Sequence, residues 1–292
     1  MSPRCADASV ARGEELAATA STVSVFLLIE DPGPWGPHVL HSARLPEAVR
    51  ARLRALSARV GVRTLLIRRP GRAEGDGGPR LVVVANARHG WAETTRVNDL
   101  AEVAALELDA ARGPDGVGLT PHADPLLLVC THGRHDPCCA ERGRPLAAAV
   151  AASYPDLTWE ASHLGGDRFA GNLVALPRGD YFGRLDPNTG PAAVASYLAG
   201  TLDLAHYRGR SDRGWVAQAA EQRARLAFGA AGLDDVTVTG VGREGSGHLV
   251  RLLVRGREVA AHVRVGRGAS AHLTCHADHD DAPPVYDVVL EG

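Results

Sequence analysis

The sequence contains no lysine, carries almost no net charge and has no long hydrophobic run, and each of these absences argues against a class of protein. All 32 basic residues are arginine, they are balanced by 34 acidic residues, and the formal net charge of the 292-residue chain is -2. Proteins that bind nucleic acid or membrane surfaces need a concentrated positive field, so we expect neither kind of partner. No stretch approaches the roughly 20 apolar residues of a membrane-spanning helix.

The first 20 residues lack the continuous apolar core of a secretion signal, because Asp7, Glu14 and Glu15 interrupt them. These residues are small and polar, and we expect residues 1–20 to be flexible. Without a signal segment, the expected location is the cytoplasm, which is a reducing compartment.

Cysteine is scarce, and its distribution is uneven. Five cysteines in a chain of this length are too few for a framework of disulfide bonds. Three of the five, Cys130, Cys138 and Cys139, nevertheless fall within ten residues. In a reducing compartment such clustering is more typical of metal binding or redox chemistry than of disulfide bonding.

Hydrophobic patterning predicts an α/β fold of mixed α+β character, with three units after the flexible residues 1–20. An α/β unit is expected over residues 21–118, where the apolar run Val25–Ile29 fits a buried strand and an apolar stripe at helical spacing follows it. Residues 119–211 predict a second unit of strand, helix, strand and hairpin. Residues 212–292 predict one helix and then apolar strands between glycine-rich turns, which is typical of a small antiparallel α+β appendage.

The informative segment starts at Cys130, at the end of the second unit's buried strand. Asp136 and Pro137 suit the N-cap and the first position of the next helix, so Cys139 falls in its first turn. Unpaired N–H groups and the positive end of the helix dipole lower the pKa of a thiol there and favour the metal-binding thiolate. The short loop is expected to bring the two cysteines together.

A second element, His163-Leu164-Gly165-Gly166-Asp167, follows the next strand. Its two glycines permit a tight loop that turns both His163 and Asp167 inward. Two thiolates and one imidazole at the ends of neighbouring strands suit an iron–sulfur cluster or a zinc ion.

These segments resemble the sucrase/ferredoxin-like family, whose thioredoxin-like ferredoxin domain binds a [2Fe–2S] cluster. The resemblance rests on four stretches: Cys130 to Cys139 (C-x8-C), His163 to Asn172 (HLGGDRFAGN), the hairpin Leu173 to Leu185, and Tyr207-Arg208-Gly209-Arg210. It implies a thioredoxin-like ferredoxin domain over the second unit. The first unit is then interpreted as a related α/β unit without cysteines, which covers the sheet or docks a partner.

The resemblance implies Cys130, Cys139 and His163 as cluster ligands. Family members place C-x3-C or H-x3-H on the later loop, whereas this chain has His163-x3-Asp167. Carboxylate ligation of iron–sulfur clusters is uncommon, but Asp167 stands at the matching position and is favoured over each rival. The alternatives for this fourth position are His132, His135 and Cys138.

The function implied by the resemblance is one-electron transfer to or from a redox protein partner, either a reductase or an electron acceptor. The chain is then an electron carrier rather than an enzyme with its own substrate. Two other hypotheses remain: a thiol–disulfide oxidoreductase or redox sensor that uses Cys130 with Cys139 or Cys138, and a zinc-stabilised interaction module. No C-x2-C stands at a strand–helix junction, which weighs against the first. Sugar hydrolysis is not favoured, because no pair of carboxylates stands out.

Other polar residues are interpreted as structural. Cys138 is expected to be a packing residue, and His132 and His135 to support the ligands or to face solvent. His206–Arg213 is expected to be a basic loop. A group near the C-terminus is expected to form a solvated loop: His272, Cys275, His276 and His279.

Overall fold

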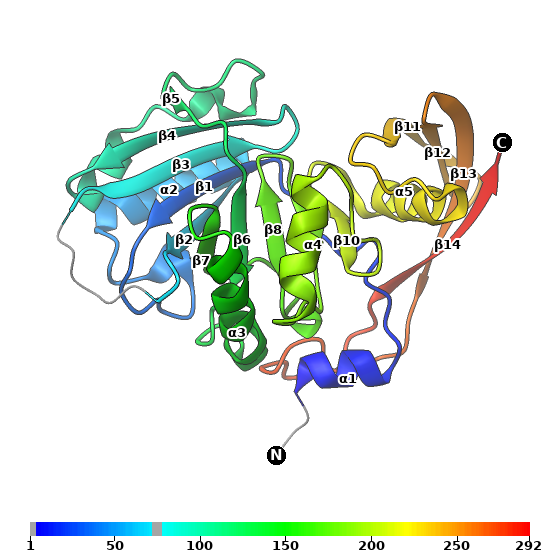
Figure 1. Cartoon of the computed structure of the whole chain (residues 1–292), viewed down its shortest axis with the longest axis horizontal. Coiled ribbons are helices and arrows are strands. Elements are labelled where there is room, and N and C mark those ends of the chain that lie inside the picture. Colours follow the sequence, from blue (N-terminus) through cyan, green and yellow to red (C-terminus); the bar gives the residue numbers. More distant parts are fainter. Residues whose placement is uncertain (1–3, 72–77) are drawn as a thin grey trace.

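A mixed sheet of ten strands is the central layer of the structure (Figure 1). The structure, a computed structural model, describes residues 4–71 and 78–292, so residues 1–3 of the segment expected to be flexible lie outside the described residues. The strand order is β10-β9-β8-β6-β7-β2-β1-β3-β4-β5. The strands are β1 (Val25–Glu30), β2 (Val62–Arg68), β3 (Arg80–Asn86), β4 (Trp91–Val97), β5 (Thr120–Pro121), β6 (Leu126–Cys130), β7 (Thr158–Ala161), β8 (Leu173–Leu176), β9 (Asp180–Phe182) and β10 (Tyr207–Arg210).

Two halves of this sheet repeat one order of elements, namely strand, helix and three strands. In the first half β1 pairs in parallel with β2 and antiparallel with β3, and α2 (Glu47–Val60) connects β1 to β2. In the second half β6 pairs in the same way with β7 and β8, and α3 (Pro137–Ser153) makes the connection. The halves meet where β2 pairs antiparallel with β7, with Ile67 opposite Ala161. The predicted α/β class is confirmed.

The hydrophobic pattern explains why these elements form where they do. The apolar stripe of α2 is Val49, Leu53, Leu56 and Val60, and all four side chains are buried against the first half of the sheet. The strand β6 is an uninterrupted apolar run, and all of its residues are buried, as is typical of a central strand covered on both faces. Its last residue therefore places a thiol inside the protein.

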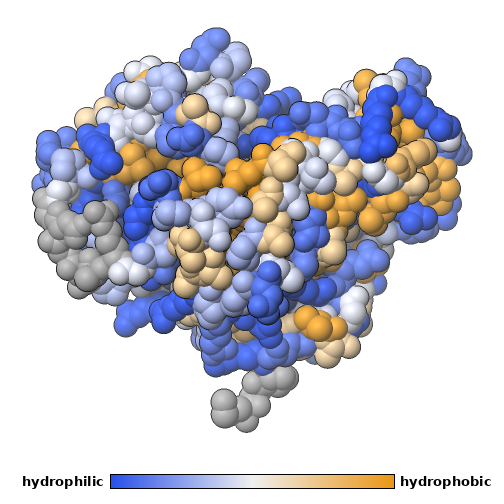
Figure 2. Space-filling view, in the orientation of Figure 1, coloured by the Kyte–Doolittle hydropathy of each residue, from blue (hydrophilic) through white to orange (hydrophobic). Residues whose placement is uncertain are grey.

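The C-terminal appendage is a separate four-stranded antiparallel sheet, as predicted. The helix α5 (Trp215–Phe228) packs against one face of it, through buried alanines and the apolar residues of the strands. Apolar surface lies over α5 and the neighbouring strands in Figure 2, and Leu226 and Val289 are among the exposed side chains. The strands are β11 (Val236–Glu244), β12 (Gly247–Val254), β13 (Arg257–Arg267) and β14 (Pro284–Glu291).

Two predictions about irregular segments are wrong. The expectation of a flexible segment over residues 1–20 fails for α1 (Cys5–Ala11), because this helix packs against η4 (Asp167–Phe169) and Cys5 is buried. The helix is too short to show a hydrophobic period. The expected basic loop His206–Arg213 contains the edge strand β10, and Arg208 within it is 1% exposed. That guanidinium is buried because backbone and side-chain oxygens surround it.

The remaining elements are short. They are α4 (Thr189–Leu198) and the 3-10 helices η1 (Val39–His41), η2 (Leu100–Ala105), η3 (Asp109–Arg112) and η4 (Asp167–Phe169). No helix among the described residues is both long and apolar enough to cross a membrane.

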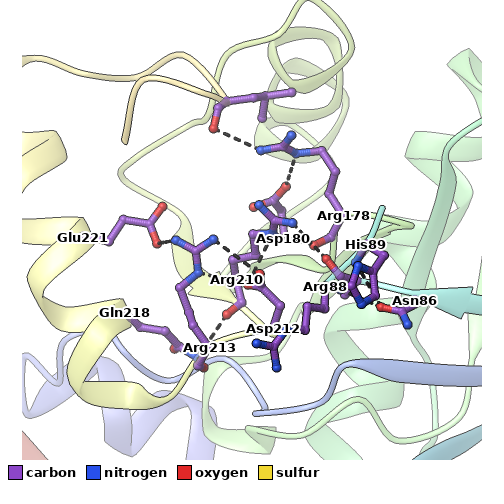
Figure 3. A network of polar contacts seen from close by, with 12 residues as sticks. Asn86, Arg88, His89, Arg178, Asp180, Arg210, Asp212, Arg213, Gln218 and Glu221 are labelled. Carbon is purple, nitrogen blue, oxygen red and sulfur yellow. Dashed lines mark hydrogen bonds and ion pairs between the residues drawn. The ribbon is translucent and has the colours of Figure 1, made fainter. Parts of the chain in front are cut away.

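A polar network joins both halves of the large sheet to the appendage (Figure 3). Arg210 on β10 donates to the backbone carbonyls of Arg178, after β8, and of Ala87, after β3. Arg213 donates to the carboxylate of Glu221 on α5 at 2.8 Å. Because Glu221 is 1% exposed, this carboxylate depends on its arginine partners for compensation. The network thus fixes α5 against the edge of the sheet.

Gly143 marks the closest approach of α3 to β6. A Cβ atom there would lie 1.9 Å from the carbonyl oxygen of Cys130. Because backbone fills that space, we expect Gly143→Ala to push α3 away from β6 and to lower the free energy of unfolding by about 3 kcal/mol or more. Urea denaturation measures the loss. Gly242→Ala on β11, where a Cβ meets nothing within 4 Å, is the control, and equal losses in the two variants would contradict the close approach.

Candidate metal site

Three of the predicted ligands lie together at the carboxyl ends of two neighbouring parallel strands. Cys130 is the last residue of β6, Cys139 lies in the first turn of α3, and His163 follows β7. Their ligand atoms, two sulfurs and one imidazole nitrogen, all lie within 4.8 Å of one another. Both sulfurs are buried, and the His163 side chain is 24% exposed. Parallel pairing produces this convergence, because it brings both strand ends to one edge.

Asp167, the fourth predicted ligand, is the first residue of η4 and contacts this group. Its Oδ1 lies 3.1 Å from the sulfur of Cys139 and 3.0 Å from Nδ1 of His163. The second contact is an ion pair when His163 is protonated, and within the described residues the buried Nδ1 of His163 makes no other polar contact. After loss of a proton, a ring nitrogen of His163 has the lone pair that ligation of a metal ion needs.

Charge and burial oppose each other in this site. The thiol of Cys139 and the imidazole of His163 hold the pKa of Cys130 well below its ordinary value, although burial acts the other way. Burial disfavours a charged His163, but the adjacent Asp167 and Cys130 raise its pKa to about 9. Burial likewise opposes ionisation of Asp167, and the neighbouring His163 nevertheless lowers its pKa. In the chain alone, an imidazolium offsets one of the two negative charges of the thiolate and the carboxylate.

His132 has both ring nitrogens engaged. Its Nδ1 accepts a hydrogen bond from the backbone N–H of His163 at 3.1 Å, so the proton resides on Nε2, which donates to the carbonyl of Gly36 at 2.6 Å. Burial lowers the pKa of His132, which favours this neutral form. His132 therefore positions the ligand loop from the side and has no lone pair left for a metal ion.

His135 keeps one nitrogen free of hydrogen bonds within the described residues. Its Nδ1 donates to the carbonyl of Pro37 at 3.1 Å, so Nε2 carries the lone pair of the neutral ring, and this atom lies 3.8 Å from Oδ2 of Asp167. The ring stacks on that of His163 with 3.7 Å between centroids. Ligand atoms of His135, His163 and Asp167 form a second group within 4.8 Å. His135 thus competes with Asp167 for the fourth position.

Cys138 lies apart from Cys130, in a different group with Cys5, Cys275 and Asp136. Asp136 caps α3 as predicted, since its side chain accepts from the backbone N–H of Cys138. The expectation of a solvated C-terminal loop is wrong for Cys275, which is partly buried against the other two sulfurs. It holds for the histidines of that loop, which are exposed: His272, His276 and His279.

The ligand loop, residues 163–167, is held by hydrogen bonds to its backbone carbonyls. Arg63 on β2 donates to the carbonyl of the first residue, and the hydroxyl of Ser21 donates to that of the second, both at 2.9 Å. Gly165 and Gly166 have φ angles of +97° and +79°, a region that side chains other than glycine rarely adopt. The first half of the sheet therefore contributes directly to the shape of the loop.

Arg208 holds the same loop from the other side. Its guanidinium donates to the carbonyl of Gly165 at 3.0 Å and to the side-chain oxygen of Asn172 at 2.8 Å, and it also reaches the carbonyl of Thr19. Burial lowers its pKa to about 10, so it stays charged at neutral pH. Sequence reasoning missed this role, although Arg208 lies in one of the motifs that carried the family resemblance.

The fold and the site define an α/β protein with a candidate metal site of two cysteine sulfurs and a histidine nitrogen. A family model described as Sucrase/ferredoxin-like matches residues 16–209, which is more than half of the chain. The chain therefore belongs to the sucrase/ferredoxin-like family. Comparisons with curated proteins and with solved structures find no significant match.

We expect Arg208→Lys to destabilise the protein despite keeping the charge. A single ammonium group cannot donate to all of the oxygens that the guanidinium contacts, so some carbonyls stay buried without a donor. We expect this loss to lower the free energy of unfolding by about 3 kcal/mol. Chemical denaturation measures the change. Arg267→Lys, at a side chain that is 76% exposed, is the control and should change stability by less than about 0.5 kcal/mol. A neutral Arg208→Lys would show that the ligand loop does not depend on this residue.

Proposed function

We propose that this chain binds a [2Fe–2S] cluster through Cys130, Cys139, His163 and Asp167 and acts as a one-electron carrier for a redox protein partner. The observation that carries the proposal is the meeting of two buried cysteine sulfurs with a ring nitrogen of His163, all within 4.8 Å of one another. Membership of a family with ferredoxin in its description supports the same cofactor.

The donor set fits this cofactor. Iron–sulfur clusters are held mainly by thiolates, with imidazole as the commonest replacement, and a bound cluster supplies one-electron redox chemistry at a potential that imidazole ligands raise. The low pKa of Cys130 favours the thiolate that ligation needs. The apolar core around both sulfurs excludes water. The stacked rings of His135 and His163 are each 24% exposed, and they form the part of the site nearest to a docked partner.

A zinc ion is the second candidate for the same ligands, because three donor atoms within 4.8 Å also suit one tetrahedral ion. Such a protein would be an interaction module without redox activity. A thiol–disulfide function is less well supported, since the thiols of Cys130 and Cys139 are both buried. Colour separates these candidates, because only the cluster absorbs visible light.

We expect Cys139→Ser to abolish cluster incorporation, because a hydroxyl oxygen replaces a soft thiolate ligand. Freshly purified wild-type protein should be red-brown, with about two iron and two sulfide ions per chain, whereas the variant should be colourless. Cys138→Ser is the matched control: its sulfur contacts Cys5 and Cys275 instead of Cys130, so the variant should keep its iron. Equal loss of iron in both variants, or colourless wild-type protein containing zinc, would overturn the proposal.

The fourth ligand is tested by comparing Asp167→Ala with His135→Ala. Oδ1 of Asp167 lies within 3.1 Å of both the Cys139 sulfur and Nδ1 of His163, whereas Nε2 of His135 lies 3.8 Å from Oδ2 of Asp167. We therefore expect Asp167→Ala to lower iron content and to change the electron paramagnetic resonance spectrum of the reduced protein. His135→Ala should leave that spectrum nearly unchanged, and the reverse pattern would make His135 the ligand.

A further inference from the structure

The three cysteines outside the candidate site converge on one point. The Cys5 sulfur lies 3.6 Å from that of Cys138 and 3.5 Å from that of Cys275, and the Cys138 and Cys275 sulfurs are 3.4 Å apart. These residues come from α1, from the first turn of α3, and from the connection between β13 and β14. Three segments this distant in sequence thus each contribute one sulfur to a triangle.

Polar groups around the triangle are arranged as they are around metal-bound thiolates. The backbone N–H of Cys5 donates to the sulfur of Cys275 at 3.5 Å, and that of Ala6 donates to the sulfur of Cys138. Asp136, which is fully buried, accepts from the backbone N–H groups of Cys138 at 2.9 Å and Cys275 at 2.8 Å. Each of its oxygens retains a lone pair, and they lie 3.7 and 3.9 Å from the sulfur of Cys5.

Hydrophobic burial alone gives a weak reason for this convergence. The apolar cluster at this place comprises only small side chains, the three cysteines with Ala6 and Ala170. The connection 268–283 forms no helix or strand and runs from the appendage to α1 and α3 (Figure 1). Connections of this length without regular structure are uncommon and are usually either functional or disordered. Small clusters that cannot hold a segment by burial are typically secured by a metal ion or a disulfide.

We propose that Cys5, Cys138 and Cys275 bind a structural zinc ion, with the carboxylate of Asp136 as the fourth ligand. In a tetrahedral site with zinc–sulfur bonds of about 2.3 Å, neighbouring sulfurs are about 3.8 Å apart, close to the sides of this triangle. Three thiolates with one carboxylate form the closed four-ligand set of a structural site. Soft sulfur ligands select zinc over magnesium or calcium.

Such an ion would fasten α1 and the connection 268–283 to the first turn of α3. It would do so beside the candidate cluster site, because Cys138 and Cys139 are adjacent and serve the two sites separately. Cys5 and Cys275 lie outside the residues 16–209 that the family model matches. Two of the four proposed zinc ligands therefore lie outside the family match and two, Asp136 and Cys138, lie inside it, and the zinc site shares no ligand with the proposed cluster.

The test measures zinc and iron in the same samples of the untagged full chain by inductively coupled plasma mass spectrometry. Cys275→Ser should lose about one zinc ion per chain and keep its iron, whereas Cys139→Ser should lose its iron and keep that zinc. His276→Ala, at the exposed neighbour of Cys275, is the control and should keep both metals. Zinc retained in Cys275→Ser would overturn the proposal, whether or not the wild-type protein contains iron.

Wild-type protein provides a second measurement that does not depend on the folding of variants. X-ray absorption at the zinc edge should show three sulfur ligands and one oxygen. Samples kept in reducing buffer and in air-oxidised buffer are denatured and alkylated. Cys5, Cys138 and Cys275 should be alkylated in both samples, which shows that they form no disulfide bond. Zinc-free protein, or a disulfide between any two of Cys5, Cys138 and Cys275, would contradict the proposal.

Discussion

The convergence of two buried sulfurs and one buried imidazole nitrogen at the ends of β6 and β7 is the constraint on which the candidate site depends. Parallel pairing of these strands brings Cys130 and His163 to one edge, and the start of α3 adds Cys139. Burying a thiolate and a carboxylate requires compensating positive charge. In the chain alone, a protonated His163 supplies one such charge, with its pKa raised to about 9. A bound metal centre would replace that proton and leave the imidazole as a ligand.

The cysteine-free first half of the sheet has a clear structural role. It repeats the order of elements of the second half. In that order the loop after β1 corresponds to the loop after β6, which connects Cys130 to Cys139. Carbonyls of Gly36 and Pro37 in that loop fix the rings of His132 and His135, and Arg63 on β2 holds the ligand loop. The repeated arrangement therefore supports the site, because one half supplies the candidate ligands and the other half orients them.

Local patterns predicted most of the regular elements and the convergence of Cys130, Cys139 and His163. The stripe of α2, the buried run of β6 and the Asp136-Pro137 start of α3 each follow from neighbouring residues, and parallel strand ends follow from the α/β order. Contacts across long sequence distances could not be predicted. From the sequence, Arg208 is expected in a basic loop, because the oxygens that surround it come from distant segments. Cys5 and Cys275 are 270 residues apart, so no local spacing relates them. The choice between Asp167 and His135 depends on hydrogen bonds to a loop from the other half.

Pulsed electron paramagnetic resonance of the dithionite-reduced protein, prepared with 15N-labelled histidine, tests the role of His163 most directly. We predict the signal of a reduced [2Fe–2S] cluster with a strongly coupled histidine nitrogen, and the loss of that coupling in His163→Cys, where a thiolate takes its place. A reduced cluster without nitrogen coupling, or a protein with no paramagnetic signal and zinc bound to these residues, would contradict a histidine-ligated electron carrier.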